Sequence, residues 1–264
     1  MTFLDQITVL VLTFNEEDNI QQTLAALTRF SQVVVLDSGS TDSTAAKVEK
    51  FPNARLCVRA FDQHARQWNY GLEDCQIETP WVLALDADYQ LSEALVDEIA
   101  NLRPTEEVVG FSASFRYCVF GRPLKGSLYP PVIVLYRKAH ARYIQQGHTQ
   151  RLKIAGPTGT LTAKILHDDR KPLARWLSSQ QNYARLEAAH LLSTPRGELR
   201  TVDRIRLRAW LAPFVVFFYT LIIKRCIFDG WPGWYYALQR MVAETFIALA
   251  ILDRRLRGRG AARG

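Results

Sequence analysis

Four strand-like runs alternate with helix-type segments in the first 90 residues, and this alternation is the feature that most restricts the fold. The runs are residues 7–14, 33–37, 54–61 and 81–86. Continuous apolar, β-branched runs suit strands that are covered on both faces, as in a parallel sheet. Because helix-type segments separate them, the sequence predicts an α/β domain with a Rossmann-like parallel sheet.

Polar clusters stand at the ends of three of these strands. FNEE follows the first strand, DSGSTD begins at the end of the second, and DAD ends the fourth. The carboxyl ends of parallel strands lie along one edge of a sheet, where ligands of such sheets bind. We therefore expect the three clusters to converge on one site.

The pattern changes after about residue 107. Residues 108–120, 132–138 and 161–167 read as further strands between loops that contain Gly and Pro, which predicts a mixed or antiparallel extension of the sheet. Residues 171–192 then read as a helix with one apolar stripe. We expect an α/β domain over residues 1–170 and a helical region over residues 171–264.

Three motifs in the first domain resemble a known family. VLTFNEEDNI, VVVLDSGSTDST and WVLALDADYQLS are similar in order and spacing to the nucleotide-sugar half of family 2 glycosyltransferases, which have the GT-A fold. More loosely, GHTQRL, ILHDDRKPLARWL and KRCIFDGWPGWYYALQR resemble lipopolysaccharide-core and related cell-envelope enzymes. The resemblance implies inverting transfer of a sugar from a nucleotide donor, most often a UDP-sugar, to a lipid-linked or lipopolysaccharide-core acceptor.

The resemblance assigns a metal site to the DAD motif. A hard cation such as Mn²⁺ or Mg²⁺ would neutralise the charge that develops on the diphosphate leaving group. By the resemblance, Asp88 ligates the metal, and Asp86 contacts the ribose or the metal's water shell. His167 is a further metal ligand by the same resemblance, with a hydrogen-bonded structural histidine as the alternative. The alternative for the two aspartates is a helix N-cap pair, although Ser92 is better placed for that cap. Tyr89 replaces the Glu that the family often has, a change expected to affect packing more than chemistry.

The same resemblance gives candidate donor-binding residues. Asp37 would accept a hydrogen bond from a uracil ring, with a turn residue for Gly39 as the alternative. Asn15 and Glu16 follow the first strand, where the family contacts the nucleoside. Arg66 would approach the diphosphate, and a plain surface arginine is the equal alternative.

The catalytic base stays open between three residues. Relatives commonly have a carboxylate where this chain has GHTQRL, and an amide such as Gln150 cannot take a proton. His148 can act as a base at physiological pH. Asp168 and Asp169 are the other candidates, and their alternative role is to pair with Arg170 or Lys171.

The C-terminal region combines basic and apolar stretches. The chain has 33 basic and 26 acidic residues, and the surplus lies in residues 196–208 and 253–264. Between them, residues 209–223 and 241–252 are apolar but short for a membrane span. Aromatic residues at 231–236 favour the headgroup region. We expect an anionic membrane surface as partner, at the cytoplasmic face of the inner membrane, and no nucleic acid; a core hairpin or a homo-oligomer interface is the alternative.

Four scattered cysteines, at positions 57, 75, 118 and 226, show no metal-type spacing. With no signal peptide evident, they predict reduced thiols in a cytosolic protein.

Two other functions remain open at this point: a polyprenyl-phosphate glycosyltransferase, and a catalytically silent module that binds a nucleotide sugar at the membrane.

Overall fold

The structure is a computed structural model that describes residues 2–146 and 149–261. The chain divides into two compact units. The first contains residues up to Pro123 together with Tyr129–Arg170, and the second contains Leu124–Leu128 together with the residues from Lys171 onward. The short segment Leu124–Leu128 therefore packs with the C-terminal helices, although the sequence analysis assigned it to the first domain.

The main sheet of the first unit has a parallel centre. Over the described residues its strand order is β12-β6-β9-β4-β1-β2-β3. Strand β1 pairs in parallel with β2 and β4, and β2 pairs in parallel with β3. Strand β9 runs antiparallel to both β4 and β6, so the mixed extension that the sequence predicted is confirmed. The strands are β1 Ile7–Thr13, β2 Gln32–Asp37, β3 Ala54–Val58, β4 Trp81–Asp86, β6 Gly110–Ala113, β9 Val132–Arg137 and β12 Thr158–Thr160.

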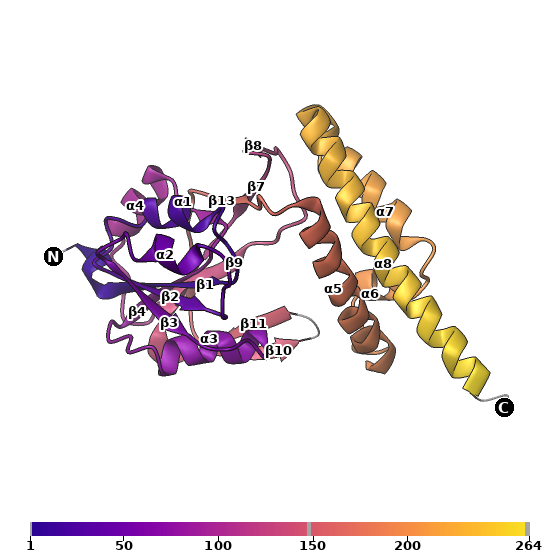
Figure 1. Cartoon of the computed structure of the whole chain (residues 1–264), viewed down its shortest axis with the longest axis horizontal. Helices are drawn as coiled ribbons and strands as arrows, with labels where there is room; N and C mark the ends of the chain where they lie inside the picture. The colour runs from indigo at the N-terminus through magenta and orange to yellow at the C-terminus, as the bar shows by residue number, and fades with distance from the viewer. Residues whose placement is uncertain (1, 147–148, 262–264) are drawn as a thin grey trace. The chain divides into compact units, whose positions relative to one another are not determined.

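Apolar side chains cover both faces of this sheet. Val9 and Val11 face a core that includes residues of α1 (Ile20–Ala25), α2 (Thr44–Val48) and α4 (Glu93–Ala100). Leu10 faces the other core, with α3 (His64–Glu73) and the hairpin of β10 (Ala141–Gln146) and β11 (Thr149–Ile154). Figure 1 shows these two layers on opposite sides of the strands. Burial on both faces explains why the strands read as continuous apolar runs.

Helix α3 lies unusually close to the sheet. A Cβ added at Gly71 would lie 2.7 Å from Cδ2 of Leu10 in β1, so a larger residue would require the Leu10 side chain to shift. Trp68 and Leu72 of the same helix are buried in the core beneath it. Helix α3 is thus fixed by close packing against β1.

A second, smaller sheet has the order β5-β13-β7-β8. Strand β13 (Ile165–Asp168) pairs antiparallel with β5 (Tyr89–Gln90) and in parallel with β7 (Phe115–Val119), which is followed by β8 (Arg122–Pro123). This sheet places His167 opposite Tyr89 on one side and Tyr117 on the other. It therefore connects the segment after DAD with the late segment ILHDD.

The second unit is helical. Helix α8 (Trp231–Ala261) packs against α5 (Leu173–Ser193) and α7 (Ala212–Phe218), as Figure 1 shows. The remaining elements are α6 (Thr201–Arg206), the π-helix η3 (Tyr219–Ile223) and the 3-10 helix η4 (Cys226–Asp229). Ala188, Leu191, Leu199 and Ile251 form a small core between α5, α8 and the intervening loop.

Helix α8 is longer than the sequence indicated. The aromatic residues at 231–236 and the apolar stretch at 241–252 belong to one continuous helix. Pro232 lies in its first turn, where a missing backbone N–H costs nothing. By length and composition, Trp231–Gly258 is long and apolar enough to cross a membrane, whereas the sequence analysis considered only residues 241–252 of this helix.

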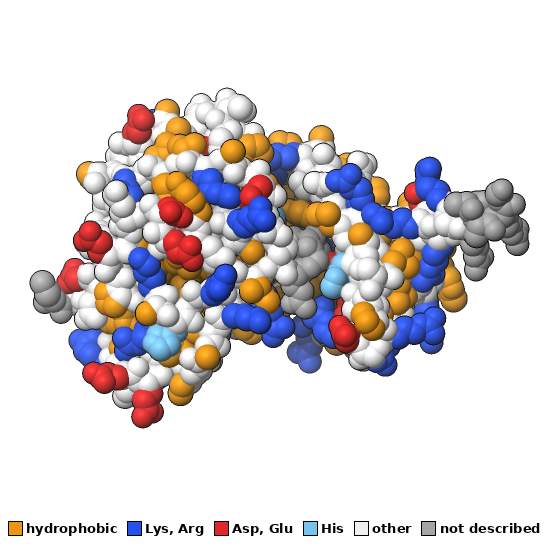
Figure 2. Space-filling model, turned by 90° about the horizontal axis from the view of Figure 1, so that it is seen from below, with side chains coloured by type: hydrophobic (Ala, Val, Ile, Leu, Met, Phe, Trp, Pro, Cys, Tyr) orange, Lys and Arg blue, Asp and Glu red, His pale blue; other side chains and the backbone are white. Residues whose placement is uncertain are grey.

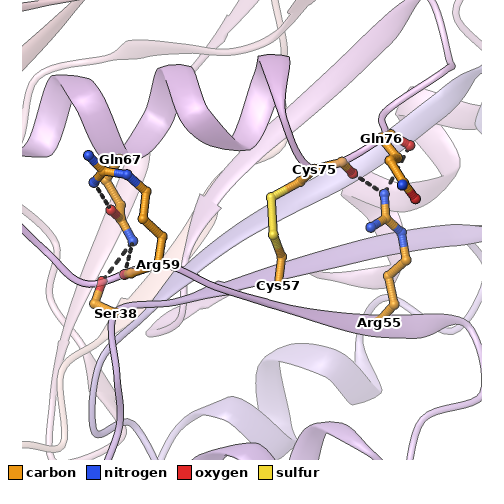
Figure 3. The surroundings of a disulfide bond; sticks show 7 residues. All are labelled: Ser38, Arg55, Cys57, Arg59, Gln67, Cys75 and Gln76. Carbon is orange, nitrogen blue, oxygen red and sulfur yellow. Dashed lines mark hydrogen bonds between the residues drawn. A yellow bond between two sulfur atoms is a disulfide. The ribbon is translucent and has the colours of Figure 1, made fainter.

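Cys57 and Cys75 form a disulfide in this structure (Figure 3), so the prediction of reduced thiols was wrong for these two residues. The bond joins β3 to the residue that follows the end of α3 by two positions. Nearby, the Arg55 guanidinium donates hydrogen bonds to the carbonyl oxygens of Cys75 and Gln76. Cys118 and Cys226 are buried free thiols.

Candidate functional site

The ends of β1, β2 and β4 bring the predicted polar residues to one edge of the main sheet. In the register of the strands, Thr13 lies beside Asp37 of β2, and Leu12 lies beside Asp86 of β4. Asp37 and Asp86 therefore flank the end of the same central strand. This convergence is what the strand-and-helix order of the sequence predicted.

Asp37 holds the turn that follows β2. Its Oδ2 accepts hydrogen bonds from the backbone N–H groups of Gly39 (3.1 Å) and Ser40 (2.7 Å), and its Oδ1 accepts one from the Ser40 hydroxyl. Gly39 has a φ of +89°, which a residue with a Cβ adopts only with strain. The turn role, which the sequence analysis left open, is present; the predicted contact with a uracil ring stays a prediction.

The loops after β1 and β2 are tied together by side chains. Asn15 has a left-handed backbone with φ 52°, and its Oδ1 accepts a hydrogen bond from the Thr41 N–H at 2.7 Å. The Asn15 N–H donates to the Ser40 hydroxyl at 2.8 Å, and the Glu16 N–H donates to the Thr44 hydroxyl at 2.8 Å. Both loops therefore form one continuous rim before any ligand binds. These cross-loop roles were not predicted, because the pairing of two separate loops leaves no local signal in the sequence.

A residue of helix α3 hydrogen-bonds to the segments that follow β2 and β3. Gln67 is fully buried, and its amide nitrogen donates to the Ser38 hydroxyl and to the Arg59 carbonyl, each at 3.1 Å (Figure 3). Its amide oxygen accepts a hydrogen bond from the Arg59 guanidinium at 2.6 Å. Gln67 thus joins the segments that follow β2 and β3, a role that the sequence did not indicate.

Asp88 and His167 lie in contact, although 79 positions separate them in the sequence. Asp88 Oδ2 is 3.3 Å from His167 Nε2, and both side chains are more than 90% buried. The pairing of β5 with β13 produces this contact, because Tyr89 lies opposite His167. Two predicted metal ligands are thus brought together. The N-cap alternative does not apply to Asp88, because Ser92 provides the cap of α4 through a hydrogen bond from Leu95 N–H.

Three tyrosine rings surround the His167 imidazole. The ring centroids of Tyr89, Tyr117 and Tyr129 lie 5.1, 5.0 and 4.7 Å from that of His167, all edge to face. Burial is the largest single influence and lowers the pKa of His167, but the charge of Asp88 and its hydrogen bond, together with the charges of Asp169 and Asp86, raise it, and the net pKa is raised. His167 Nδ1 has no hydrogen-bond partner among the described residues. The aromatic enclosure keeps the imidazole in one orientation beside Asp88.

Tyr89 is a site residue whose role the sequence analysis underestimated. Its ring packs on Phe115 (4.9 Å) as well as on His167, and its phenol hydrogen-bonds to Asp86. Burial, reinforced by the negative charge of Asp86, raises the pKa of the phenol well above its usual range, so it stays a donor. The expectation of an effect on packing more than on chemistry was incomplete, because the hydroxyl also contacts a predicted donor-binding carboxylate.

The residues fit a metal ion that is shared with a ligand. Within residues 2–146 and 149–261, no group of three or more His, Cys, Asp and Glu side chains is arranged to hold a metal. Asp88 and His167 supply two adjacent donors. Mg²⁺ in phosphate-transfer sites is typically held by one or two carboxylates, with waters and substrate phosphates completing the shell. An incomplete protein shell is therefore compatible with a cation bound together with a diphosphate.

The candidate bases differ in their surroundings. Asp168 is buried, and its two oxygens accept hydrogen bonds from the Gly121 N–H (3.1 Å) and from Arg170 Nε (2.8 Å). The pairing with Arg170 that the sequence analysis left open is thus present. Asp169 is half-buried and close enough to His167 for its charge to raise the pKa of that residue. His148 lies outside the described residues.

Arg66 lies on α3 with an exposed side chain. Its guanidinium pairs with Asp62 Oδ2 at 3.1 Å, one helical turn away. This is the surface role that the sequence analysis gave as the alternative. The predicted contact of Arg66 with a diphosphate stays a prediction.

Comparison with known proteins identifies the family. Residues 8–163, more than half of the chain, match the family model for glycosyl transferase family 2. The lipopolysaccharide core biosynthesis glycosyltransferase LpsC of Rhizobium meliloti (strain 1021) is 32% identical over 116 residues, which cover 42% of each protein. An uncharacterised glycosyltransferase of Rickettsia conorii (strain ATCC VR-613 / Malish 7) is 31% identical over 96 residues, covering 36% of this chain and 33% of that protein. The matched region thus spans less than half of these relatives.

Among solved structures, that of S. aureus TarS 1-349 with UDP-GlcNAc is similar with a TM-score of 0.47 and 18% identity, over 95% of this chain and 91% of that one. Glucosyl-3-phosphoglycerate synthase from Mycobacterium tuberculosis has a TM-score of 0.47 and 15% identity, over 70% of this chain and 79% of that one. The assignment rests on the family model, whose match runs from β1 to just before β13 and includes DSGSTD and DAD. The chain therefore belongs to glycosyl transferase family 2, and it resembles the lipopolysaccharide-core members of that family.

Proposed function

We propose that this protein is a metal-dependent glycosyltransferase that moves a sugar from a UDP-sugar to a lipid-linked or lipopolysaccharide-core acceptor, with inversion. The observation that carries the proposal is the buried contact between Asp88 and His167 beside Asp86, at the strand ends of a family 2 domain. The acceptor class is proposed from the similarity to LpsC, a lipopolysaccharide-core enzyme in Rhizobium meliloti.

Each strand-end residue has a distinct task in this proposal. Asp37 and the rim around Asn15 and Glu16 would bind the nucleoside, and Asp86, held by Tyr89, would contact the ribose. Asp88 and His167 would hold Mn²⁺ or Mg²⁺. When bound, such a cation supplies charge neutralisation for the departing diphosphate.

The base must take the proton of the acceptor hydroxyl as that oxygen attacks the sugar. Asp168 is poorly suited to this task, because its carboxylate is buried and already accepts hydrogen bonds from Gly121 and Arg170. Asp169 and His148 are therefore the proposed candidates. Comparing Asp169→Asn with His148→Ala at saturating donor tests them, since loss of the base lowers kcat by about 10²–10⁴-fold.

We place the protein at the cytoplasmic face of the inner membrane, where nucleotide sugars are available. Support comes from the similarity to a lipopolysaccharide-core enzyme and from the apolar helix α8. The net positive charge of the chain, +7, is suited to an anionic surface.

The decisive experiment measures donor binding and turnover. Thermal unfolding is followed with UDP-sugars and other nucleotide sugars, with and without Mn²⁺, because a bound ligand raises the apparent stability. Slow release of UDP from the donor without acceptor then separates an active enzyme from a silent module. Asp88→Asn should abolish turnover and the Mn²⁺-dependent shift, whereas Asp74→Asn, an exposed acid just after α3, should not. Unchanged turnover in a folded Asp88→Asn variant would refute the metal role.

A further inference from the structure

The second unit exposes many large apolar side chains, and such a surface marks a candidate interaction site. Most of its large exposed apolar side chains lie between residues 210 and 256, from α7 through η3 and η4 into α8, and four others, Leu173, Leu186, Leu192 and Val202, lie on α5 and α6. On α7 to η4 they are Trp210, Phe214, Val215, Phe218, Tyr219, Ile222, Ile223, Ile227 and Phe228. On α8 they are Trp231, Trp234, Leu238, Val242, Leu249, Leu252 and Leu256. We call these sixteen residues the apolar surface.

The α8 part of the apolar surface is a single stripe. Its members are spaced by three, four or seven residues, which is the spacing of one face of a helix. The opposite face is buried in the unit and includes Tyr236, Ala248 and Ile251. The stripe extends over residues 231–256, or about 38 Å at 1.5 Å per residue. Helix α8 is thus apolar on two faces, of which the protein covers only one.

The charge of this region indicates what covers the other face. Residues 196–264 contain thirteen Lys and Arg against five Asp and Glu. Lys224 and Arg225 precede α8, and Arg254, Arg255 and Arg257 lie at its C-terminal end, so basic side chains stand at both ends of the stripe. Figure 2 shows hydrophobic and basic side chains together on the part of the surface that leads to the C-terminus. The apolar side chains are suited to the acyl chains of a bilayer, and the basic side chains beside them are suited to its anionic headgroups.

The packing of α8 decides between crossing the bilayer and lying on it. Helix α5 packs along α8 and exposes a polar face that includes Gln181, Asn182 and Arg185. In a spanning orientation α8 would carry this polar face into the hydrocarbon, where a central arginine is strongly disfavoured. With α8 in the membrane plane, the stripe enters the lipid while α5 keeps its contact with water.

We infer that the apolar surface binds an anionic lipid bilayer with α8 lying in the membrane plane and not crossing it. The inference deepens the proposed function, on which it rests for the identity of the membrane, by naming the contact surface and its orientation. Vesicle binding needs neither donor nor acceptor, so it is measured independently of sugar transfer. If the unmodified chain does not bind vesicles but still transfers sugar to a soluble acceptor, this inference is wrong and the proposed function stands.

The first experiment is co-sedimentation of the 264-residue chain with vesicles of phosphatidylethanolamine and phosphatidylglycerol. Leu238→Gln with Leu249→Gln should weaken partitioning about tenfold, because two exposed leucines lose their burial in lipid. The matched control is Leu173→Gln with Leu186→Gln, two exposed leucines of α5, which should leave binding within about twofold of the parent. The assigned surface is wrong if the two double substitutions weaken binding equally. It is also wrong if the chain forms a stable dimer that does not bind vesicles.

The second experiment tests orientation on the unmodified chain. Trypsin is added outside sealed vesicles to which the protein has bound, and the fragments are identified by mass. In the membrane plane, the arginines at 254–257 remain outside and the C-terminal tail is removed. If α8 spans, the tail is protected until the vesicles are opened, and the in-plane orientation is wrong. Arg254→Gln with Arg255→Gln should also weaken binding about fivefold per charge at low salt and less at high salt.

Discussion

In the second unit, three buried acidic side chains from three helices surround the guanidinium of Arg206. Replacing Arg206 by methionine should therefore strongly destabilise that unit. Its guanidinium contacts Glu244 of α8 at 2.5 Å and Glu187 of α5 at 3.2 Å. Asp203, one turn earlier in α6, lies 3.9 Å away. All three acidic side chains are only 8% exposed. A single arginine thus links α5, α6 and α8.

The expected cost follows from what Arg206→Met leaves behind. Methionine keeps much of the side-chain volume, so the loss is mainly electrostatic. Removing one partner of a buried ion pair costs about 3–5 kcal/mol, because the remaining charge is left without compensation. Two glutamates lose their close cationic partner here, while the 22% exposure of Arg206 allows some water to reach them. We therefore expect a loss of about 3–5 kcal/mol in the free energy of unfolding.

Urea unfolding followed by tryptophan fluorescence measures this loss. Four of the six tryptophans, at positions 176, 210, 231 and 234, belong to the second unit and report on it. The matched control is Arg204→Met, an exposed arginine of the same helix, which should change stability by less than about 0.5 kcal/mol. Adding Glu187→Gln and Glu244→Gln to Arg206→Met should restore much of the loss. Equal midpoints for Arg206→Met and Arg204→Met would refute the reasoning.

Three further substitutions test the first unit. Tyr89→Phe removes the hydrogen bond to Asp86 and should lower kcat/KM about 10–100-fold, since hydrogen bonds to charged groups contribute about 1.5–3 kcal/mol. Steady-state kinetics measures this loss, and Tyr70→Phe on α3 is the control. Asp168→Asn should lower stability by about 1–3 kcal/mol while kcat falls less than about tenfold, because its carboxylate mainly holds Gly121 and Arg170. Asn15→Ala should weaken donor binding in calorimetry, and Asn15→Gly should weaken it less, because glycine tolerates the left-handed backbone.

Much of the first unit was predictable because its pattern is local. The runs at β1, β2 and β4 are apolar on both faces, and their polar ends follow directly in the sequence. The convergence of Asp37 and Asp86 then needs only the rule that parallel strands end at one edge. The contact of Asp88 with His167 depends on the pairing of β5 with β13, which was not predicted. Only the family resemblance had assigned both residues to one metal site.

Long-range pairing explains what the sequence did not indicate. Gln67 and the Arg206 cluster combine residues from distant segments, and no local spacing marks them. The aromatic cluster at 231–236 and the apolar stretch at 241–252 were described separately, yet both lie in α8, and Pro232 fits the first turn of that helix. Tyr89 was read as a packing residue because its hydroxyl partner, Asp86, depends on the turn between β4 and β5.

The disulfide between Cys57 and Cys75 and the proposed cytoplasmic location point in opposite directions, because cytosolic thiols are kept reduced. At a sequence separation of 18, the cross-link stabilises the fold by about 3 kcal/mol in the chain-entropy model. Helix α3 is also held by buried Trp68 and Leu72 and by the close approach at Gly71, none of which needs the bond. Reduction should therefore lower the unfolding temperature but leave UDP-sugar binding in place, as should Cys57→Ser. If reduction abolishes donor binding in protein that remains folded, the cross-link is required for function and the cytoplasmic location is wrong.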